Sequence, residues 1–183
     1  MSKPNWPHQR CVSHVAGIFF CLAARQPRLC FVLPTAALRQ QCKNRTLPAG
    51  RIHQVGRSSF EPVTVAMLRE YREETGGTSD CVERLSGIGA PFTHKTGLGQ
   101  DKFIQGFAGI VSEMHNCPRF RDEIAQVDWL PRDDWAETIA TMNRGKQLLV
   151  YELLSGFCEL SRMPENLKRH VRGFLQQPQL LAA

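Results

Sequence analysis

The sequence predicts a fold of the α/β (α+β) class, in which helices pack on a mixed β-sheet. Three observations support this class. Segments typical of strands and of helices mix along the chain without a regular βα alternation. The length of 183 residues corresponds to about one domain. A composition of 42% hydrophobic and 22% charged residues excludes a disordered chain, and no apolar run reaches the roughly 18 residues of a membrane-spanning helix.

We therefore expect one domain over residues 1–183, beginning with an arm and two strands. Residues 1–10 are polar, contain two prolines and predict an irregular N-terminal arm. Residues 12–24 and 29–34 predict two strands joined by a short turn at Gln26-Pro27.

The apolar run 15–24 allows a second interpretation. Because it follows Lys3 and Arg10, it loosely resembles a secretory signal. Its Phe19 and Phe20 favour a strand instead, and a second apolar run follows as a hairpin partner would. The sequence therefore predicts a strand here and a cytoplasmic protein.

A long loop and a helix come next. Residues 38–60 predict a loop rich in Arg, Gln, Gly and Ser, and a loop of this length is either functional or disordered. Residues 62–75 give the clearest helix, because Pro62 suits the first helical position and Gly76-Gly77 suits a left-handed stop.

The second half of the chain predicts three more strands and then three helices. Strands are expected near 81–90, at 102–112 and at 124–130, the last one ending at a proline. A helix is expected from 133 to about 141. Two closing helices are expected in the C-terminal part, 145–183, where they would pack on the rest of the domain; these are 145–160 and 164–176.

Seven cysteines are present, an odd number, and no two of them have CxxC spacing. This pattern argues against a disulfide framework and against a zinc knuckle. It predicts buried or half-buried free thiols in a reducing compartment.

The helix predicted at 62–75 carries an unusual group of acids. Glu70, Glu73 and Glu74 fall within an arc of about 100°. They repel one another, and they lie toward the helix C-terminus, where the macrodipole disfavours negative charge. Cations must neutralise them. One alternative is that Arg69 pairs with Glu73 at i,i+4, with help from Arg72. The other is that a divalent metal ion binds, and Mg²⁺ and Mn²⁺ both prefer oxygen ligands.

The wider spacing resembles the Nudix box of the Nudix hydrolase family. The charged part of that pattern matches at these positions: Glu61, Arg69, Glu70, Glu73, Glu74 and Gly76, with Tyr71 as the first apolar residue. Two positions depart from the pattern. Val55 stands where the opening glycine is expected, and Gly77 stands where a closing apolar residue is expected. A five-residue insertion between Gly50 and Glu61 would explain the first departure.

The resemblance implies a Nudix-type α/β/α sandwich with a mixed sheet, and hydrolysis of a nucleoside diphosphate linked to another group. It implies Mg²⁺ or Mn²⁺ held by Glu70, Glu73 and Glu74, with Glu61 either joining the metal site or bracing the loop. Arg69 would orient the cluster. The general base would be Glu70 or Glu123, the latter lying about six residues before a tryptophan as in a late segment of the family.

Gly50 and the nearby basic residues are the predicted contacts of the substrate phosphates. Backbone near Gly50 would approach the phosphates, because glycine permits close contact. The formal net charge is +6 despite the acidic helix, so basic residues near the site could attract phosphates. These basic residues are Arg39, Lys43, Arg45, Arg51 and Arg57.

Several alternatives stay open. The substrate is an NTP or dNTP, an ADP-sugar or a dinucleotide polyphosphate, and Pro91 resembles a feature of the ADP-ribose branch, although turn prolines are commoner. A non-hydrolytic module that binds a nucleotide or RNA is the second function, and hydrolysis at an RNA 5′ end is a third.

A loop at 94–99 could cover the site, and the closing helices could form a homodimer contact. Aromatic residues could stack a base, with core packing as the default role; they are Phe92, Phe103, Phe107, Trp129 and Trp135.

Overall fold

The computed structural model describes residues 12–35, 45–56, 59–95, 101–119 and 122–177. Six strands form one mixed sheet: β1 (His14–Cys21), β2 (Arg28–Pro34), β3 (Ala49–Arg51), β4 (Val82–Lys95), β5 (Asp101–Val111) and β6 (Ile124–Pro131). The strand order is β4-β5-β1-β2-β6, and β3 pairs with β1 off this path. The predicted α+β class with a mixed sheet is confirmed.

Strand β1 lies in the middle of this sheet. It runs parallel to β5, from His14 opposite Ile104 to Cys21 opposite Val111. Its first half pairs antiparallel with β3 and its last residues pair antiparallel with β2. Every residue after His14 in β1 is buried, which explains the continuous apolar run and confirms that it is a strand.

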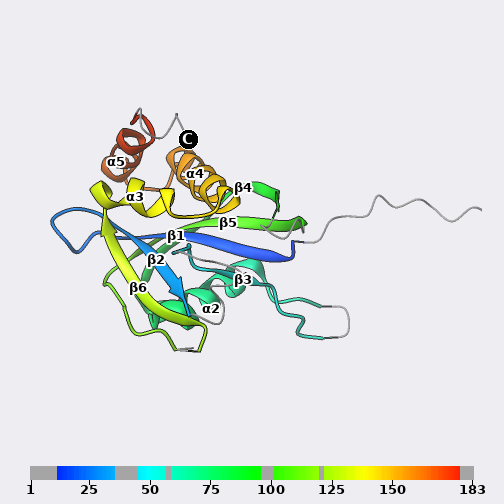
Figure 1. Cartoon of the computed structure of the whole chain (residues 1–183). Helices are drawn as coiled ribbons and strands as arrows, with labels where there is room; N and C mark the ends of the chain where they lie inside the picture. Colours follow the sequence, from blue (N-terminus) through cyan, green and yellow to red (C-terminus); the bar gives the residue numbers. More distant parts are fainter. Residues whose placement is uncertain (1–11, 36–44, 57–58, 96–100, 120–121, 178–183) are drawn as a thin grey trace, which may run out of the picture.

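Helices cover both faces of the sheet (Figure 1). Helix α2 (Val63–Thr75) covers one face, and α3 (Trp135–Ala140), α4 (Arg144–Glu159) and α5 (Glu165–Leu175) cover the other. Short 3-10 turns, η1 (Ser79–Cys81) and η2 (Arg132–Asp134), precede β4 and α3. The result is the predicted α/β/α sandwich.

The two faces of the sheet belong to two separate cores. Along β1, Ile18 and Phe20 point into the core beneath α3, α4 and α5. Val15 and Phe19 point into the smaller core beneath α2, which also holds Met67. This alternation follows from the period of two along a strand.

Several predicted boundaries were wrong. The loop predicted at 38–60 contains β3, and Thr46 adds a single bridge to Val32. Strand β4 runs on to Lys95 rather than ending near residue 90, so His94 lies in a strand. Pro91 also lies in β4, where the pairing with β5 shifts register between Ile88 and Phe92; a residue without a backbone N–H is tolerated at such an irregularity.

The helices match their predictions to within one or two residues. Pro62 precedes α2 as its cap instead of being its first helical residue. The helix expected from 133 begins as η2 and becomes α-helical at Trp135. The predicted arm at 1–10, and residues 96–99 of the predicted loop, lie outside the described residues.

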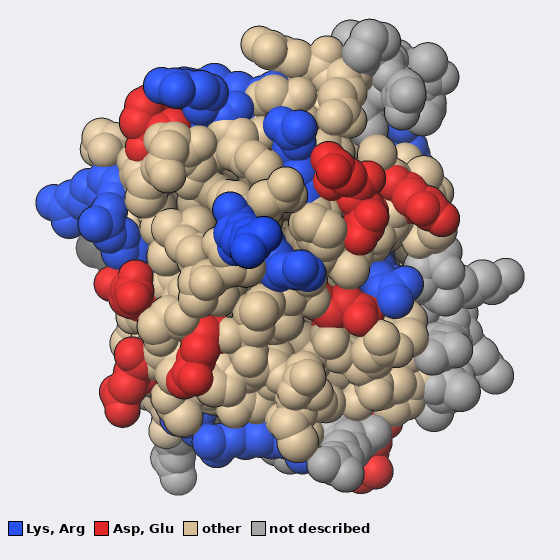
Figure 2. All heavy atoms as spheres, turned by 90° about the vertical axis from the view of Figure 1, so that its left-hand side faces the viewer, with Lys and Arg blue, Asp and Glu red and all other residues tan. Residues whose placement is uncertain are grey.

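The described cysteines form no disulfide. Cys21, Cys30, Cys81 and Cys158 are buried, as predicted, whereas Cys117 is exposed. Among the described residues, no helix has the length and apolar character needed to cross a membrane. On the face shown in Figure 2, basic and acidic side chains are interspersed among neutral ones, so this face carries no large patch of one charge.

Candidate functional site

Helix α2 places its acidic residues beside strand β3. The helix buries Ala66, Met67 and Tyr71 against the sheet and ends at Gly76, whose φ of 80° is the left-handed conformation that glycine adopts readily. The neighbouring part of its surface faces β3 and the residues that follow it. Glu70 lies in this region and is itself buried.

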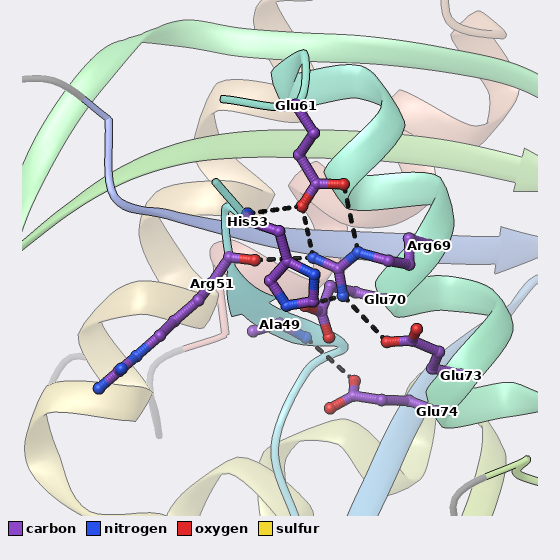
Figure 3. Close-up of polar contacts among 8 residues, drawn as sticks. All are labelled: Ala49, Arg51, His53, Glu61, Arg69, Glu70, Glu73 and Glu74. Atoms are coloured by element: carbon purple, nitrogen blue, oxygen red, sulfur yellow. Dashed lines mark hydrogen bonds and ion pairs between the residues drawn. The ribbon is translucent and has the colours of Figure 1, made fainter. Parts of the chain in front are cut away.

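Arg69 ties the acidic residues together (Figure 3). Its Nη1 donates hydrogen bonds to Glu70 Oε1 at 2.7 Å and to Glu73 Oε2 at 2.9 Å. Its Nη2 and Nε donate to the two carboxylate oxygens of Glu61, at 2.6 Å and 3.2 Å. Nη2 also donates to the backbone carbonyl of Arg51 at 2.7 Å. The predicted Arg69–Glu73 pair is therefore present, within a larger network that joins α2 to β3.

Glu61 braces the segment that leads into α2. Besides the contacts with Arg69, its Oε1 accepts a hydrogen bond from the backbone N–H of His53 at 2.8 Å. The hydrogen bond from Arg69 lowers the pKa of Glu61, so the carboxylate is held in its ionised form. Of the two roles predicted for Glu61, these contacts favour the bracing role.

Glu70 and Glu74 lie against β3. Glu74 Oε2 accepts a hydrogen bond from the backbone N–H of Ala49 at 3.0 Å. A Cβ placed on Gly50 would overlap Glu70 Oε1, so only a glycine leaves room for this carboxylate. Burial raises the pKa of Glu70, and burial together with the charge of Glu70 raises the pKa of Glu74 well above its usual range. Both carboxylates therefore carry negative charge only at an energetic cost.

The structure does not gather the three glutamates around one point. Among the described residues, the only group of three or more His, Cys, Asp and Glu whose ligand atoms all lie within 4.8 Å of one another is elsewhere in the fold. Glu70 and Glu73 turn toward Arg69, whereas Glu74 turns toward Ala49 (Figure 3).

Glu123 is close enough to interact electrostatically with this group. It is exposed and lies just before β6, where its backbone carbonyl accepts a hydrogen bond from Thr35 N at 2.8 Å. Its negative charge contributes to the raised pKa of Glu74. The late segment and the acidic helix, which are far apart in sequence, are thus brought within electrostatic range.

The basic residues predicted near the site have different positions. Arg45 Nε forms an ion pair with Asp128 at 2.7 Å, so its side chain is engaged with β6. The exposed side chain of Arg51 extends away from the glutamates (Figure 3). Arg39, Lys43 and Arg57 lie outside the described residues.

Two side chains near the site, Lys146 and His53, were missed by sequence reasoning. Lys146 lies on the first turn of α4. Its charge lowers the pKa of Glu74 and so partly offsets the increase caused by burial and by the charge of Glu70. The charge of His53 acts in the same direction on Glu70. Neither residue belongs to a recognisable motif, so only the fold reveals this proximity.

The two departures from the Nudix box have structural explanations. Residues 53–56 lie beside residues 59–61, with hydrogen bonds from Glu61 N to His53 O and from Val55 N to Ser59 O. These pairings lie in the segment that follows Gly50, where the insertion is expected. At Gly77, a Cβ would lie 2.5 Å from Cε1 of Tyr71, so the Tyr71 ring fills the space of the missing apolar side chain.

Most of the candidate stacking aromatics belong to the core. Phe107, Trp129 and Trp135 are buried, as the default role predicted. Phe92 and Phe103 are half-buried.

Neither a protein-family model nor a curated protein matches this sequence. Solved structures do match it. A Nudix hydrolase from Nitrosomonas europaea superposes with a TM-score of 0.60 at 18% identity, over 85% of this chain and 95% of that chain. This protein has the Nudix fold.

Two further Nudix-fold structures are similar to it. The Ap4A hydrolase of C. elegans, in a binary complex, gives a TM-score of 0.57 at 12% identity, over 81% of this chain and 99% of that chain. The Nudix domain of Shewanella oneidensis NrtR, complexed with ADP-ribose, gives 0.55 at 15% identity, over 81% and 86%. At these identities the likeness establishes the fold, and the activity has to be argued from the site.

Proposed function

We propose that this protein is a metal-dependent hydrolase that cleaves the diphosphate bond of a nucleoside diphosphate linked to another group. The observation that carries the proposal is the charge imbalance beside β3. Glu61, Glu70, Glu73 and Glu74 are four carboxylates, and within the described part of the chain Arg69 is the one guanidinium that bonds to them. It contacts the first three, and Glu74 accepts a hydrogen bond from Ala49 N.

The residues present fit a divalent cation such as Mg²⁺ or Mn²⁺. Carboxylate oxygens are the donors that both ions prefer. The raised pKa values of Glu70 and Glu74 mean that ionising both is unfavourable, and a nearby divalent charge would remove this penalty. The missing side chain of Gly50 lets the backbone of β3 pack directly against the Glu70 carboxylate. Glu70, Glu73 and Glu74 would hold the ion.

Each residue then has a defined task. Arg69 and Glu61 hold β3 against α2, because they bond to each other and to the backbone of Arg51 and His53. The N–H of Ala49 orients Glu74. When bound, the cation neutralises charge on the phosphoryl oxygens and makes a water molecule more acidic. Glu70 or Glu123 would accept the proton of that water.

The substrate class follows from the Nudix-fold relatives and from the surroundings of the site. The two relatives named with a ligand or substrate involve ADP-ribose and Ap4A, both of which contain a nucleoside phosphate linked to another group. Backbone at Gly50 would contact the phosphates, and the exposed side chain of Arg51 would have to turn toward the glutamates to join it. A role for Arg45 in this contact would require it to leave Asp128.

The second candidate is a module that binds a nucleotide or RNA without cleaving it. The contacts of Glu70 and Glu73 with Arg69 favour it to a degree, because a pure binding site does not need these carboxylates to hold a metal. A homodimer and a cytoplasmic location remain predictions from the sequence.

The test is hydrolysis of a nucleotide panel with Mg²⁺ or Mn²⁺, in which the released products are identified. The panel contains NTPs and dNTPs, ADP-ribose and a dinucleotide polyphosphate. We expect metal-dependent cleavage of at least one substrate by the unaltered protein. We expect Glu74→Gln to abolish it with the fold intact, since the amide keeps the shape of the side chain and removes its charge.

Glu137→Gln, the same change on the exposed surface of α3, is the matched control and should keep full activity. Full activity in Glu74→Gln would refute the metal assignment. Nucleotide binding without any product, with either metal, would favour the binding module.

A further inference from the structure

A second cluster of ligand-type side chains lies beyond the C-terminal end of α2, on segments that follow the helix in the chain. The pairing of Val82 with Val111 aligns the start of β4 with the end of β5. Ser112 N donates a hydrogen bond to Cys81 O at 2.9 Å, which fixes the two segments side by side. Residues about thirty positions apart in the sequence therefore meet here.

Three side chains converge in this cluster. Cys81 Sγ lies 3.1 Å from Glu113 Oε1 and 3.2 Å from His115 Nε2. His115 Nε2 lies 3.4 Å from Glu113 Oε1. A thiol, an imidazole and a carboxylate are the three common ligand types of zinc in proteins. We propose that Cys81, Glu113 and His115 form a Zn²⁺ site with an open fourth position.

The separations suit such an ion. With Zn–S of about 2.3 Å and Zn–N or Zn–O of about 2.0–2.1 Å, tetrahedral geometry places ligand atoms about 3.3–3.6 Å apart. The observed separations, 3.1 to 3.4 Å, need an expansion of only a few tenths of an ångström. The exposed Glu113 provides this freedom, because 64% of its side chain is accessible.

The three side chains differ in burial: Cys81 and His115 are largely enclosed, whereas Glu113 is exposed. Cys81 is 8% exposed and the side chain of His115 is 23% exposed. The Glu113 side faces solvent, so the fourth position would be filled by water. Zn²⁺ binding would release the proton of the Cys81 thiol, which binds the metal as a thiolate.

Surrounding contacts hold the ligands in place. Thr78 Oγ1 lies 3.1 Å from Cys81 Sγ and can donate a hydrogen bond to the thiolate. The backbone carbonyl of His115 accepts a hydrogen bond from Trp129 Nε1 at 2.7 Å. Outer contacts of this kind orient the ligands of protein metal sites.

The site would brace the segment that supports α2. The chain from His115 runs past the end of the helix, where Cys117 O lies against the backbone of Gly76. Arg119 N then donates a hydrogen bond to Glu73 O at 2.9 Å. A metal joining Cys81 to Glu113 and His115 would therefore fix the start of this segment. The site would bind Zn²⁺ in preference to Mg²⁺, because thiolate and imidazole are softer ligands than carboxylate.

The test titrates the full-length, reduced, metal-free protein with Co²⁺, which reports thiolate ligation through a charge-transfer absorption band. With excess Mg²⁺ present to occupy the carboxylates of α2, we expect the band to saturate at one equivalent of Co²⁺ and Zn²⁺ to abolish it. Cys81→Ser should abolish the band. His115→Gln should weaken Zn²⁺ binding by more than about 100-fold, and Thr78→Ala by about 10-fold, since outer contacts contribute about 10–100-fold.

Two matched controls make the result specific. Cys117→Ser changes an exposed cysteine close in sequence and should keep the band. Glu74→Gln should also keep it, which separates this site from the proposed hydrolytic one. If Cys81→Ser fails to fold, Glu113→Gln and His115→Gln serve in its place, because both side chains are at least partly exposed.

The absorption band distinguishes a zinc site from a cluster held by hydrogen bonds alone. Binding at one equivalent, lost with the ligand variants and kept in both controls, supports the site. Absence of the band in the folded, unaltered protein would show that the three groups only hydrogen-bond to one another. Persistence of the band in Cys81→Ser, or its loss in Cys117→Ser, would place the thiolate ligand elsewhere and overturn the proposal.

Discussion

Only one of the contacts that Arg69 makes could be predicted from the sequence. Its contact with Glu73 follows from helical spacing, and the sequence predicted it. Its contacts with Glu61 and with the carbonyl of Arg51 depend on the pairing of Glu61 with His53, which brings both residues beside the helix. No local rule predicts this arrangement, so the sequence alone leaves the bracing role of Glu61 as one of two alternatives.

His14 gives a prediction about pH at the residue scale. It begins β1, where its Nδ1 lies 2.9 Å from Ser13 Oγ and its buried Nε2 finds no hydrogen-bond partner among the described residues. Burial, with the charges of Lys102 and Arg51, lowers the pKa of His14 to about 4. The unfolded chain therefore binds a proton at this position more readily than the folded protein does.

Between pH 6.5 and 4 the unfolded state holds more protons at His14, so stability is present above this window and is lost as the pH falls through it. Since His14 is only partly buried, we expect a contribution on the order of 1 kcal/mol after solvent screening. His14→Gln should remove it.

Urea unfolding of both proteins at pH 7.5 and pH 5 measures this contribution. The unaltered protein should lose more free energy of unfolding between these two values than His14→Gln. Equal losses in the two proteins would show that His14 does not titrate differently in the folded state.

At the scale of elements, α2 was predicted well and β3 was missed. Pro62, the apolar positions and Gly76 are strong local signals for the helix ends. Strand β3 has only three residues and is defined by its pairing with β1, which its composition does not reveal. Strand β4 was predicted too short because Gly89, with a φ of 53°, and Pro91 interrupt its pattern.

The end of α2 gives a prediction about packing. Because a Cβ at Gly77 would lie 2.5 Å from the Tyr71 ring, Gly77→Ala should lower the free energy of unfolding by about 1–3 kcal/mol through overpacking. The double variant Tyr71→Leu with Gly77→Ala should be destabilised by less than the sum of the two single variants, because the ring that clashes is gone. Urea unfolding of the three variants measures this coupling, and strict additivity would contradict the contact.

At the scale of the whole molecule, the strand order was beyond local prediction. The parallel pairing of β1 with β5 joins segments about ninety residues apart, and nothing in either strand specifies the partner. The cluster of Cys81, Glu113 and His115 depends on the β4–β5 register. A search for closely spaced cysteines therefore could not find it, whereas the charged part of the Nudix box was visible because it lies within one continuous segment.

The two cores predict that stability and activity can be separated. Phe174 is buried in the core beneath α4 and α5 and meets Trp135 at a centroid distance of 5.2 Å. Phe174→Ala should lower the free energy of unfolding by about 3–5 kcal/mol. The glutamates of α2 lie on the other face of the sheet, so we expect unchanged hydrolytic activity at a temperature where the variant stays folded.

Met67→Ala is the matched variant in the core beneath α2. It should lose a comparable amount of stability, about 2–5 kcal/mol, and lose activity as well, because the helix that carries the glutamates is no longer held in position. Equal loss of activity in both folded variants would show that the two faces are not independent.

Binding of a divalent cation by the carboxylates of α2 can be seen by anomalous diffraction from crystals soaked in Mn²⁺. We predict an anomalous peak in contact with carboxylate oxygens of Glu70, Glu73 and Glu74, with Arg69 still bonded to Glu61. A crystal that shows no peak there, with Glu70 and Glu73 still bonded to Arg69 at saturating Mn²⁺, would contradict the claim.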